Sequence, residues 1–177
     1  MQERMERLIQ HSKLPEQLHK VDVKYVTPGV QSICNNIFSA TGIIYLYGTG
    51  YGKSTNAAAI LLSYMNGYRD CVNVENVGLY LSAFELCLHN RNRYGMDAWL
   101  TEQLELIKTC KCLVLDDMFA CLTQQDDILM QAIYSMRQYF NGVTVVVTSA
   151  IDPTDCSGGS LFRFARAAKY KEEFKWL

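Results

Sequence analysis

The sequence has few of the features that mark special classes of protein. It holds three prolines and two tryptophans among 177 residues, and its net charge at pH 7 is −1. Such a charge gives no overall attraction for nucleic acid, so contact with DNA has to come from local basic patches. No apolar run approaches the roughly 20 residues of a membrane span, and the charged opening MQERMERLIQ lacks the apolar core of a signal peptide. We therefore expect a cytoplasmic protein.

The cysteines and histidines also lack a metal-binding pattern. Seven cysteines are an odd number, and the close pair Cys110 and Cys112 is followed by no partner pair. His11, His19 and His89 are scattered along the chain. We expect reduced thiols in the core of a cytosolic protein rather than zinc ligands or disulfides. A hydrophobic share of 49% is ordinary for one folded domain of this length.

What the sequence does contain is a glycine-rich turn after a short apolar run. Residues 43–55 read IIYLYGTGYGKST, and helix-forming residues follow over 54–65. A strand, a glycine loop and a helix N-terminus together form an anion site, because backbone N–H groups and the positive end of the helix dipole point at the ligand. We expect Lys53 to reach the β- and γ-phosphates of a nucleotide and the Ser54 hydroxyl to bind Mg²⁺.

This loop departs from the usual phosphate-binding pattern at one position. The pattern G-x-x-x-x-G-K-[ST] requires glycine five residues before Gly52, where this chain has Tyr47, and Gly48 lies one residue later. The loop is therefore either a variant or one residue tighter at its start. A glycine-rich turn with a solvated lysine is the simpler interpretation, and a second motif is needed to decide.

The second motif is a pair of acids after another apolar run. Residues 112–115, CLVL, have the length and composition of a buried strand. Asp116 and Asp117 follow at its carboxyl end, where ligands bind in open α/β sheets. In a phosphate-loop enzyme the first acid holds Mg²⁺ through its water shell, and a second acid can orient and deprotonate the attacking water. Two exposed aspartates opening a loop are the alternative.

Helices and strands alternate along the rest of the chain. We expect strands at 43–47, 77–82, 112–115 and 143–149, helices at 2–11, 30–40, 54–65, 83–89, 98–109 and 127–140, and a basic helix at the end. This alternation predicts an α/β fold with a parallel sheet covered on both faces. The apolar face formed by Met5, Leu8 and Ile9 either docks a partner helix or packs on the protein's own core.

The order of the motifs resembles a known family. The segments RLIQHSKLPEQLHKVDV, VGLYLSAFELCLHNRN, LIKTCKCLVLDDM and AIYSMRQYFNGVTVVVTSA resemble successive parts of bacterial replicative helicase loaders of the DnaC/DnaI type. IstB-type transposition helpers share this module. The resemblance implies a P-loop NTPase with an AAA+ core, a central parallel β-sheet flanked by helices, and little or no C-terminal lid. It also implies an N-terminal helical lead-in over 1–40 and an ATP-binding domain over 41–177.

The resemblance assigns roles to individual residues. The Walker A residues that would bind ATP are Gly48, Thr49, Gly50, Tyr51, Gly52, Lys53, Ser54 and Thr55, with Tyr51 at a position that is usually small. Asp116 and Asp117 match the Walker B acids, so Ser54 and Asp116 would hold Mg²⁺. ATP is implied by the family, and no guanine-reading Asn-Lys-x-Asp motif is present.

Two further roles fall near the C-terminal end of the sequence. The family's sensor strand usually ends Thr-Ser-Asn, whereas here it ends Thr148-Ser149-Ala150, so efficient hydrolysis requires Ser149 or Thr148 to replace the asparagine. The family also places an arginine there that reaches the nucleotide of a neighbouring subunit. Arg163 is the first candidate and Arg166 the second, although an arginine in a basic helix is more often solvated.

The implied function is that of a replication factor with slow ATPase activity. It would bind Mg·ATP and single-stranded DNA, engage a replicative helicase and self-associate through its nucleotide interfaces. Basic and aromatic residues suited to single-stranded DNA occur in two groups: Arg91, Arg93 and Tyr94, then Phe162, Arg163, Phe164, Arg166, Lys169 and Tyr170.

Other interpretations stay open at this point. The family includes transposition helpers, and the missing sensor asparagine also allows a nucleotide-gated adaptor with little hydrolysis. Loaders carry a sizeable N-terminal domain, whereas only some forty residues precede the phosphate-loop strand here. The chain is therefore either a minimal, phage-type loader, a fragment of one, or a protein that recruits its partner differently.

Overall fold

The computed structural model describes residues 2–68, 76–91, 97–119, 123–138, 144–155 and 158–175. The strands are β1 (Gly42–Tyr47), β2 (Gly78–Ser82), β3 (Cys112–Met118), β4 (Thr144–Ser149) and β5 (Ala168–Glu173). The α-helices are α1 (Gln2–His11), α2 (Pro28–Asn35), α3 (Lys53–Gly67), α4 (Ala83–Asn90), α5 (Ala98–Thr109), α6 (Gln124–Gln138) and α7 (Gly159–Ala167). Within these ranges, no helix combines the length and the apolar composition that a membrane span requires.

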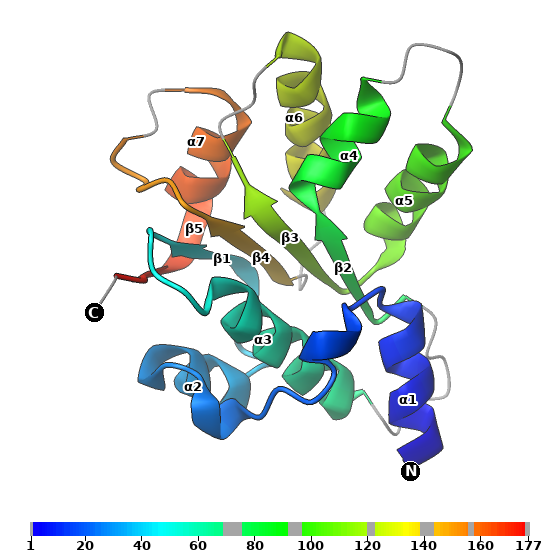
Figure 1. Ribbon diagram of the computed structural model, residues 1–177, viewed down its shortest axis with the longest axis vertical. Helices are drawn as coiled ribbons and strands as arrows, with labels where there is room; N and C mark the ends of the chain where they lie inside the picture. The colour runs from blue at the N-terminus through cyan, green and yellow to red at the C-terminus, as the bar shows by residue number, and fades with distance from the viewer. Residues whose placement is uncertain are drawn as a thin grey trace.

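The five strands form one parallel sheet in the order β2-β3-β4-β1-β5. Helices α1, α2 and α3 lie on one face of the sheet, and α4, α5, α6 and α7 lie on the other (Figure 1). The predicted α/β fold, with a parallel sheet covered on both faces, is confirmed. In this arrangement the carboxyl ends of β1, β3 and β4 are neighbours, which is where the sequence places its two nucleotide motifs.

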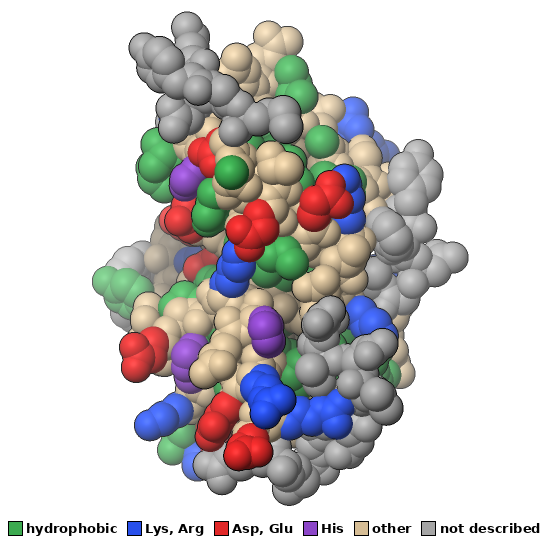
Figure 2. All heavy atoms as spheres, turned by 90° about the vertical axis from the view of Figure 1, so that its right-hand side faces the viewer, with side chains coloured by type: hydrophobic (Ala, Val, Ile, Leu, Met, Phe, Trp, Pro, Cys, Tyr) green, Lys and Arg blue, Asp and Glu red, His purple; other side chains and the backbone are tan. Residues whose placement is uncertain are grey.

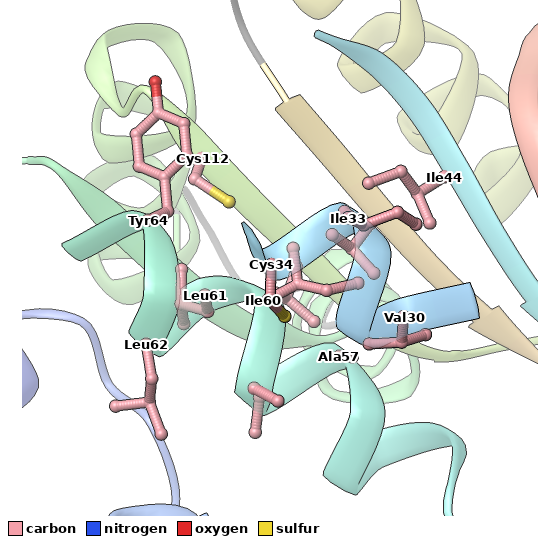
Figure 3. Close-up of a cluster of buried hydrophobic side chains, with 14 of the residues drawn as sticks. Val30, Ile33, Cys34, Ile44, Ala57, Ile60, Leu61, Leu62, Tyr64 and Cys112 are labelled. Atoms are coloured by element: carbon pink, nitrogen blue, oxygen red, sulfur yellow. The ribbon is translucent and has the colours of Figure 1, made fainter. Parts of the chain in front are cut away.

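Alternate residues of each strand supply two separate cores, because successive side chains of a strand point to opposite faces of the sheet. Ile44 and Leu46 of β1 belong to the core beneath α3, whereas Tyr45 between them belongs to the core beneath α6 and α7. Figure 3 shows the first of these cores, where side chains of α2 and α3 meet those of the sheet. Burial on both faces explains why the inner strands are continuous apolar runs.

The end of the chain differs from the prediction. The basic helix is α7, but it ends at Ala167, and residues 168–173 form a fifth strand beside β1 instead of continuing the helix. The sequence of this strand, AKYKEE, is mostly charged, and its residues alternate between half-buried and exposed. Lysine and glutamate are uncommon in strands, so pairing with β1 decides the conformation here and local preference does not.

The N-terminal segment packs on the protein's own core. Leu8 of α1 is buried, and Met5 and Ile9 pack against the same cluster beneath α3. Directly after the helix, the carbonyl of Ser12 accepts a hydrogen bond of 2.7 Å from the backbone N–H of Tyr80. The apolar face of α1 is therefore used inside the molecule, and the segment after it covers the outer edge of β2.

Candidate nucleotide-binding site

The phosphate loop connects β1 to α3 and turns sharply at its last glycine. Gly52 has φ +94° at the N-cap of α3, and no side chain caps this helix. The first N–H groups of an α-helix have no partner within the helix and attract anions. Tyr51 is 82% exposed and Thr49 is also exposed, so the middle of the loop faces outward.

Lys53 lies across the loop from which it starts. Its ammonium donates hydrogen bonds to the carbonyls of Gly48 (2.7 Å) and Gly50 (2.6 Å). Burial lowers the pKa of the Lys53 ammonium, and the carboxylates of Asp117 and Asp116 act in the opposite direction. The positive charge therefore sits at the loop and in the field of both predicted acids. To bind a phosphate, the ammonium has to exchange these carbonyls for phosphate oxygens.

The C-terminal segment after β5 supports the loop from one side. Gly50 donates its N–H to the carbonyl of Phe174 (2.8 Å), and Phe174 donates its own N–H to the carbonyl of Tyr47 (2.7 Å). A Cβ atom at Gly50 would lie 2.6 Å from the carbonyl oxygen of Lys175. The alternating glycines of the loop are thus explained in part by the close approach of this backbone.

We expect Gly48→Ala to destabilise the fold by about 2 kcal/mol, since it combines a strained backbone with a backbone clash. Gly48 has φ +108°, and its Cβ atom would lie 2.4 Å from the carbonyl oxygen of Phe174. Urea unfolding of both proteins measures the difference. Gly158→Ala is the matched control, because a Cβ built there meets no atom within 4 Å among the described residues beyond its chain neighbours. Equal midpoints for the two variants would contradict this view of the loop.

The second part of the site is a hydroxyl–carboxylate cluster around Asp116. The hydroxyls of Ser54 (2.9 Å) and Thr148 (2.6 Å) both donate to Oδ1 of Asp116. These three side chains come from α3, β3 and β4, so the cluster joins the phosphate loop to the acid-bearing strand. Mg²⁺ prefers oxygen ligands, and with substrate phosphates present it needs only one or two protein carboxylates. Ser54 and Asp116 fit this requirement.

Asp117 projects away from the cluster. Its φ is +54°, and the pairing of β3 with β4 is irregular between Leu115 and Met118. The backbone N–H of Asp117 donates to the hydroxyl of Thr148 (2.7 Å), and its side chain is exposed. The irregularity separates two adjacent acids, so that Asp116 lies among hydroxyls while Asp117 faces solvent.

The sensor positions are also separated. Thr148 contacts both acids, whereas Ser149 is fully buried and its hydroxyl accepts a hydrogen bond from the N–H of Ile151 (3.1 Å). The structure therefore brings Thr148 into the cluster and places the hydroxyl of Ser149 in the turn that follows β4. A role for Ser149 at the nucleotide stays a prediction.

Tyr80 of β2 is a residue that the sequence analysis missed. Its side chain is 5% exposed, and burial raises the pKa of its phenol, with the nearby Asp116 carboxylate as the next cause. The alternation of VGLYLS places Tyr80 on the same face as α3, two residues before the end of its strand. That pattern is the only sequence signal for it, and it becomes specific only once β2 is known to pair with β3.

Arg163 and Arg166 lie apart from this cluster, on exposed positions of α7. They line a surface pocket of about 430 Å³ together with Tyr134, Gln138, Phe162 and Ala167. Among the described residues, no hydrogen bond joins either arginine to the phosphate loop or to Asp116. A residue that acts on a neighbouring copy is expected to lie away from its own site.

The predicted DNA-contact residues are divided by the structure. The Arg91 guanidinium is bonded to the buried carboxylate of Asp126, while Arg93 and Tyr94 fall outside the described residues. In the second group, Phe164 is fully buried, and Tyr170 is half-buried and donates to Glu172. The exposed charges that remain are those of Arg163, Arg166 and Lys169.

Comparison with known proteins supports the fold. No protein-family model matches the sequence, and no curated protein matches it. Among solved structures, DnaI is 18% identical with a TM-score of 0.68, over 92% of this chain and 95% of DnaI. The DnaC helicase loader is 15% identical with a TM-score of 0.65, over 91% of this chain and 100% of that chain. The fold is that of a DnaC/DnaI-like AAA+ module.

A replication initiator, DnaA, shares the fold at 18% identity and a TM-score of 0.68. That structure contains AMPPCP and single-stranded DNA, and the match covers 93% of this chain. The present chain spans about half (52%) of that DnaA chain. In this fold, the residues that the structure brings together are Lys53, Ser54, Asp116 and Thr148.

Proposed function

We propose that the protein is an Mg·ATP-binding replication factor of the helicase-loader type, with slow ATPase activity. The observation that carries this proposal is the Ser54–Asp116–Thr148 cluster beside Lys53, at the uncapped N-terminus of α3. Ser54 and Asp116 would hold Mg²⁺, which when bound neutralises charge on the transferred phosphate. Lys53 and the N–H groups of the loop would bind the phosphates, and Asp117 would orient the attacking water.

We assign the binding of negatively charged partners to the exposed, basic surface of α7. Arg163 and Arg166 lie there beside the aromatic rings of Phe162 and Tyr134, a combination suited to phosphate and base. The face viewed in Figure 2 instead mixes charges of both signs among the described residues. We propose that α7 contacts single-stranded DNA, and that Arg163 in particular reaches the nucleotide of a neighbouring copy.

A second candidate function is that of a nucleotide-gated adaptor with little hydrolysis. The observation in its favour is the sensor strand, where Ala150 stands in place of asparagine and the Ser149 hydroxyl is bonded to the N–H of Ile151. Of the three sensor residues 148–150, Thr148 is the one whose hydrogen bonds reach the acids. Such a protein would bind ATP and a helicase and release them slowly.

ATP turnover with and without single-stranded DNA separates the two functions. For the loader we expect slow turnover that single-stranded DNA raises and that Asp117→Asn lowers by at least tenfold, the scale of losing a catalytic base. Tight ATP binding with no turnover under either condition would favour the adaptor, and no ATP binding would reject both.

Co-purification identifies the partner. Retention of a replicative helicase in the presence of Mg·ATP supports the loader, whereas retention of a transposase instead would assign the chain to the transposition helpers. The Lys53→Ala variant provides the control for nucleotide dependence in the same experiment.

A further inference from the structure

The hydroxyl of Tyr80 is a buried polar group that makes no hydrogen bond of normal geometry to any described residue. Other tyrosines of the described core differ in this respect. The Tyr45 hydroxyl donates to the carbonyl of Ile151 (3.1 Å), and the Tyr64 hydroxyl pairs with that of Tyr68 (3.5 Å). Burying a hydroxyl without a partner is unfavourable, and phenylalanine would fill the same space without that cost. An unsatisfied group of this kind calls for an explanation.

The position of Tyr80 provides one. In the pairing of β2 with β3, Tyr80 lies opposite Val114 and Ser82 lies opposite Asp116, so Tyr80 stands next to the acid-bearing end of the sheet. Its side chain is on the face covered by α3, the helix that contributes Ser54. Asp116 and Ser54, the residues that fit a metal ion, both act on the pKa of its phenol and therefore lie close to it.

The Tyr80 hydroxyl makes no hydrogen bond of normal geometry to this cluster. Oδ1 of Asp116 already accepts the hydroxyls of Ser54 and Thr148. A water molecule beside this carboxylate would accept from the phenol and remain free to bind a cation through its other lone pair. Mg²⁺ usually keeps several of its waters when it binds to protein.

We propose that Tyr80 is a positioning residue of the Mg²⁺ site. Its hydroxyl would donate a hydrogen bond to a water molecule that lies between the Asp116 carboxylate and the ion. This inference rests on the proposed nucleotide function and assigns to it a residue outside both Walker motifs. Tyr80 acts through the water and the carboxylate and does not contact the nucleotide. Its hydroxyl would then have a hydrogen-bond partner in the Mg²⁺-bound state.

The test is the Tyr80→Phe variant, measured with a fluorescent ATP analogue that is titrated with Mg²⁺ and, separately, in EDTA. We expect the Mg²⁺ concentration for half-maximal binding to rise about tenfold, as for a lost hydrogen bond to a charged site. Binding in EDTA should stay unchanged. The thermal midpoint of the free protein should be equal to that of the native chain or higher, because the variant removes an unsatisfied group.

Tyr64→Phe is the control, since it removes a hydroxyl from the same core but from a pair remote from Asp116. It should leave the Mg²⁺ dependence unchanged. An unchanged Mg²⁺ dependence in Tyr80→Phe, an equal loss in EDTA, or a lower thermal midpoint of the free variant would each overturn the inference. If the native chain bound no analogue with or without Mg²⁺, the proposed nucleotide function would fail instead.

Discussion

Lys53→Ala is expected to weaken ATP binding by roughly tenfold to a hundredfold, the range for losing one or two hydrogen bonds to a charged group. The Lys53 ammonium is half-buried, and its hydrogen bonds within the described residues go to carbonyls of its own loop, Gly48 and Gly50. A phosphate would replace neutral acceptors with charged ones, which makes the exchange favourable. Titration with a fluorescent ATP analogue measures the loss.

The fold should withstand this substitution, so a thermal melt run in parallel separates lost binding from lost structure. Lys108→Ala is the matched control, because this lysine is on the surface of α5 and pairs with Glu105. It should bind the analogue as the native chain does. Unchanged binding by a folded Lys53→Ala variant would remove the phosphate loop from the proposed function.

Asp126→Asn is expected to lower the free energy of unfolding by about 3 kcal/mol at pH 7, as when one partner of a buried ion pair is removed. The carboxylate of Asp126 is fully buried at the start of α6 and accepts three hydrogen bonds from Arg91, two of them from Nε at 3.0 and 3.1 Å. This pair joins the end of α4 to α6. Asparagine would leave the Arg91 charge without its counter-ion.

The loss should depend on pH in a defined direction. Hydrogen bonds from Arg91 are the largest cause that lowers the pKa of Asp126 in the folded state. A folded-state pKa below the unfolded value of about 3.9 gives stability that is fully present above the unfolded pKa. That stability is lost as the pH falls through the folded pKa, so the native and Asp126→Asn proteins should converge in acid.

Urea unfolding at neutral and at acid pH measures both quantities. The control is Glu105→Gln, which breaks an exposed ion pair with Lys108 and should cost less than about 0.5 kcal/mol at any pH. A difference between native and Asp126→Asn that stayed constant into acid would contradict an ionic role for Asp126. Such a constant difference would indicate that the shape or packing of the Asp126 side chain, and not its charge, stabilises the fold.

The sequence predicted the inner part of the sheet and the phosphate loop because each carries a strong local signal. Apolar runs at residues 43–47, 112–115 and 144–149 are buried on both faces, and glycine is required where backbone segments approach closely. The sequence did not predict β5, whose charged residues become a strand only through pairing with β1. Local preference is weak at a sheet edge, where a neighbouring strand decides.

The contacts within the site were harder to predict from the sequence than the residues that form it. Nothing in the triplet Thr148-Ser149-Ala150 indicates which hydroxyl turns toward Asp116. That outcome depends on the irregular pairing between β3 and β4, which turns Asp117 outward and brings Thr148 against both acids. Tyr80 was missed for a related reason, since its neighbour across the sheet is distant in sequence.

The two edge strands of the sheet, β2 and β5, limit how copies of this chain can contact one another. At β2 the backbone N–H of Tyr80 already donates a hydrogen bond to the carbonyl of Ser12. At β5 the exposed side chains are Lys169, Lys171 and Glu173. Charged side chains on an outer strand disfavour strand-to-strand aggregation. Both edge strands are therefore poorly suited to pairing with an edge strand of a second copy.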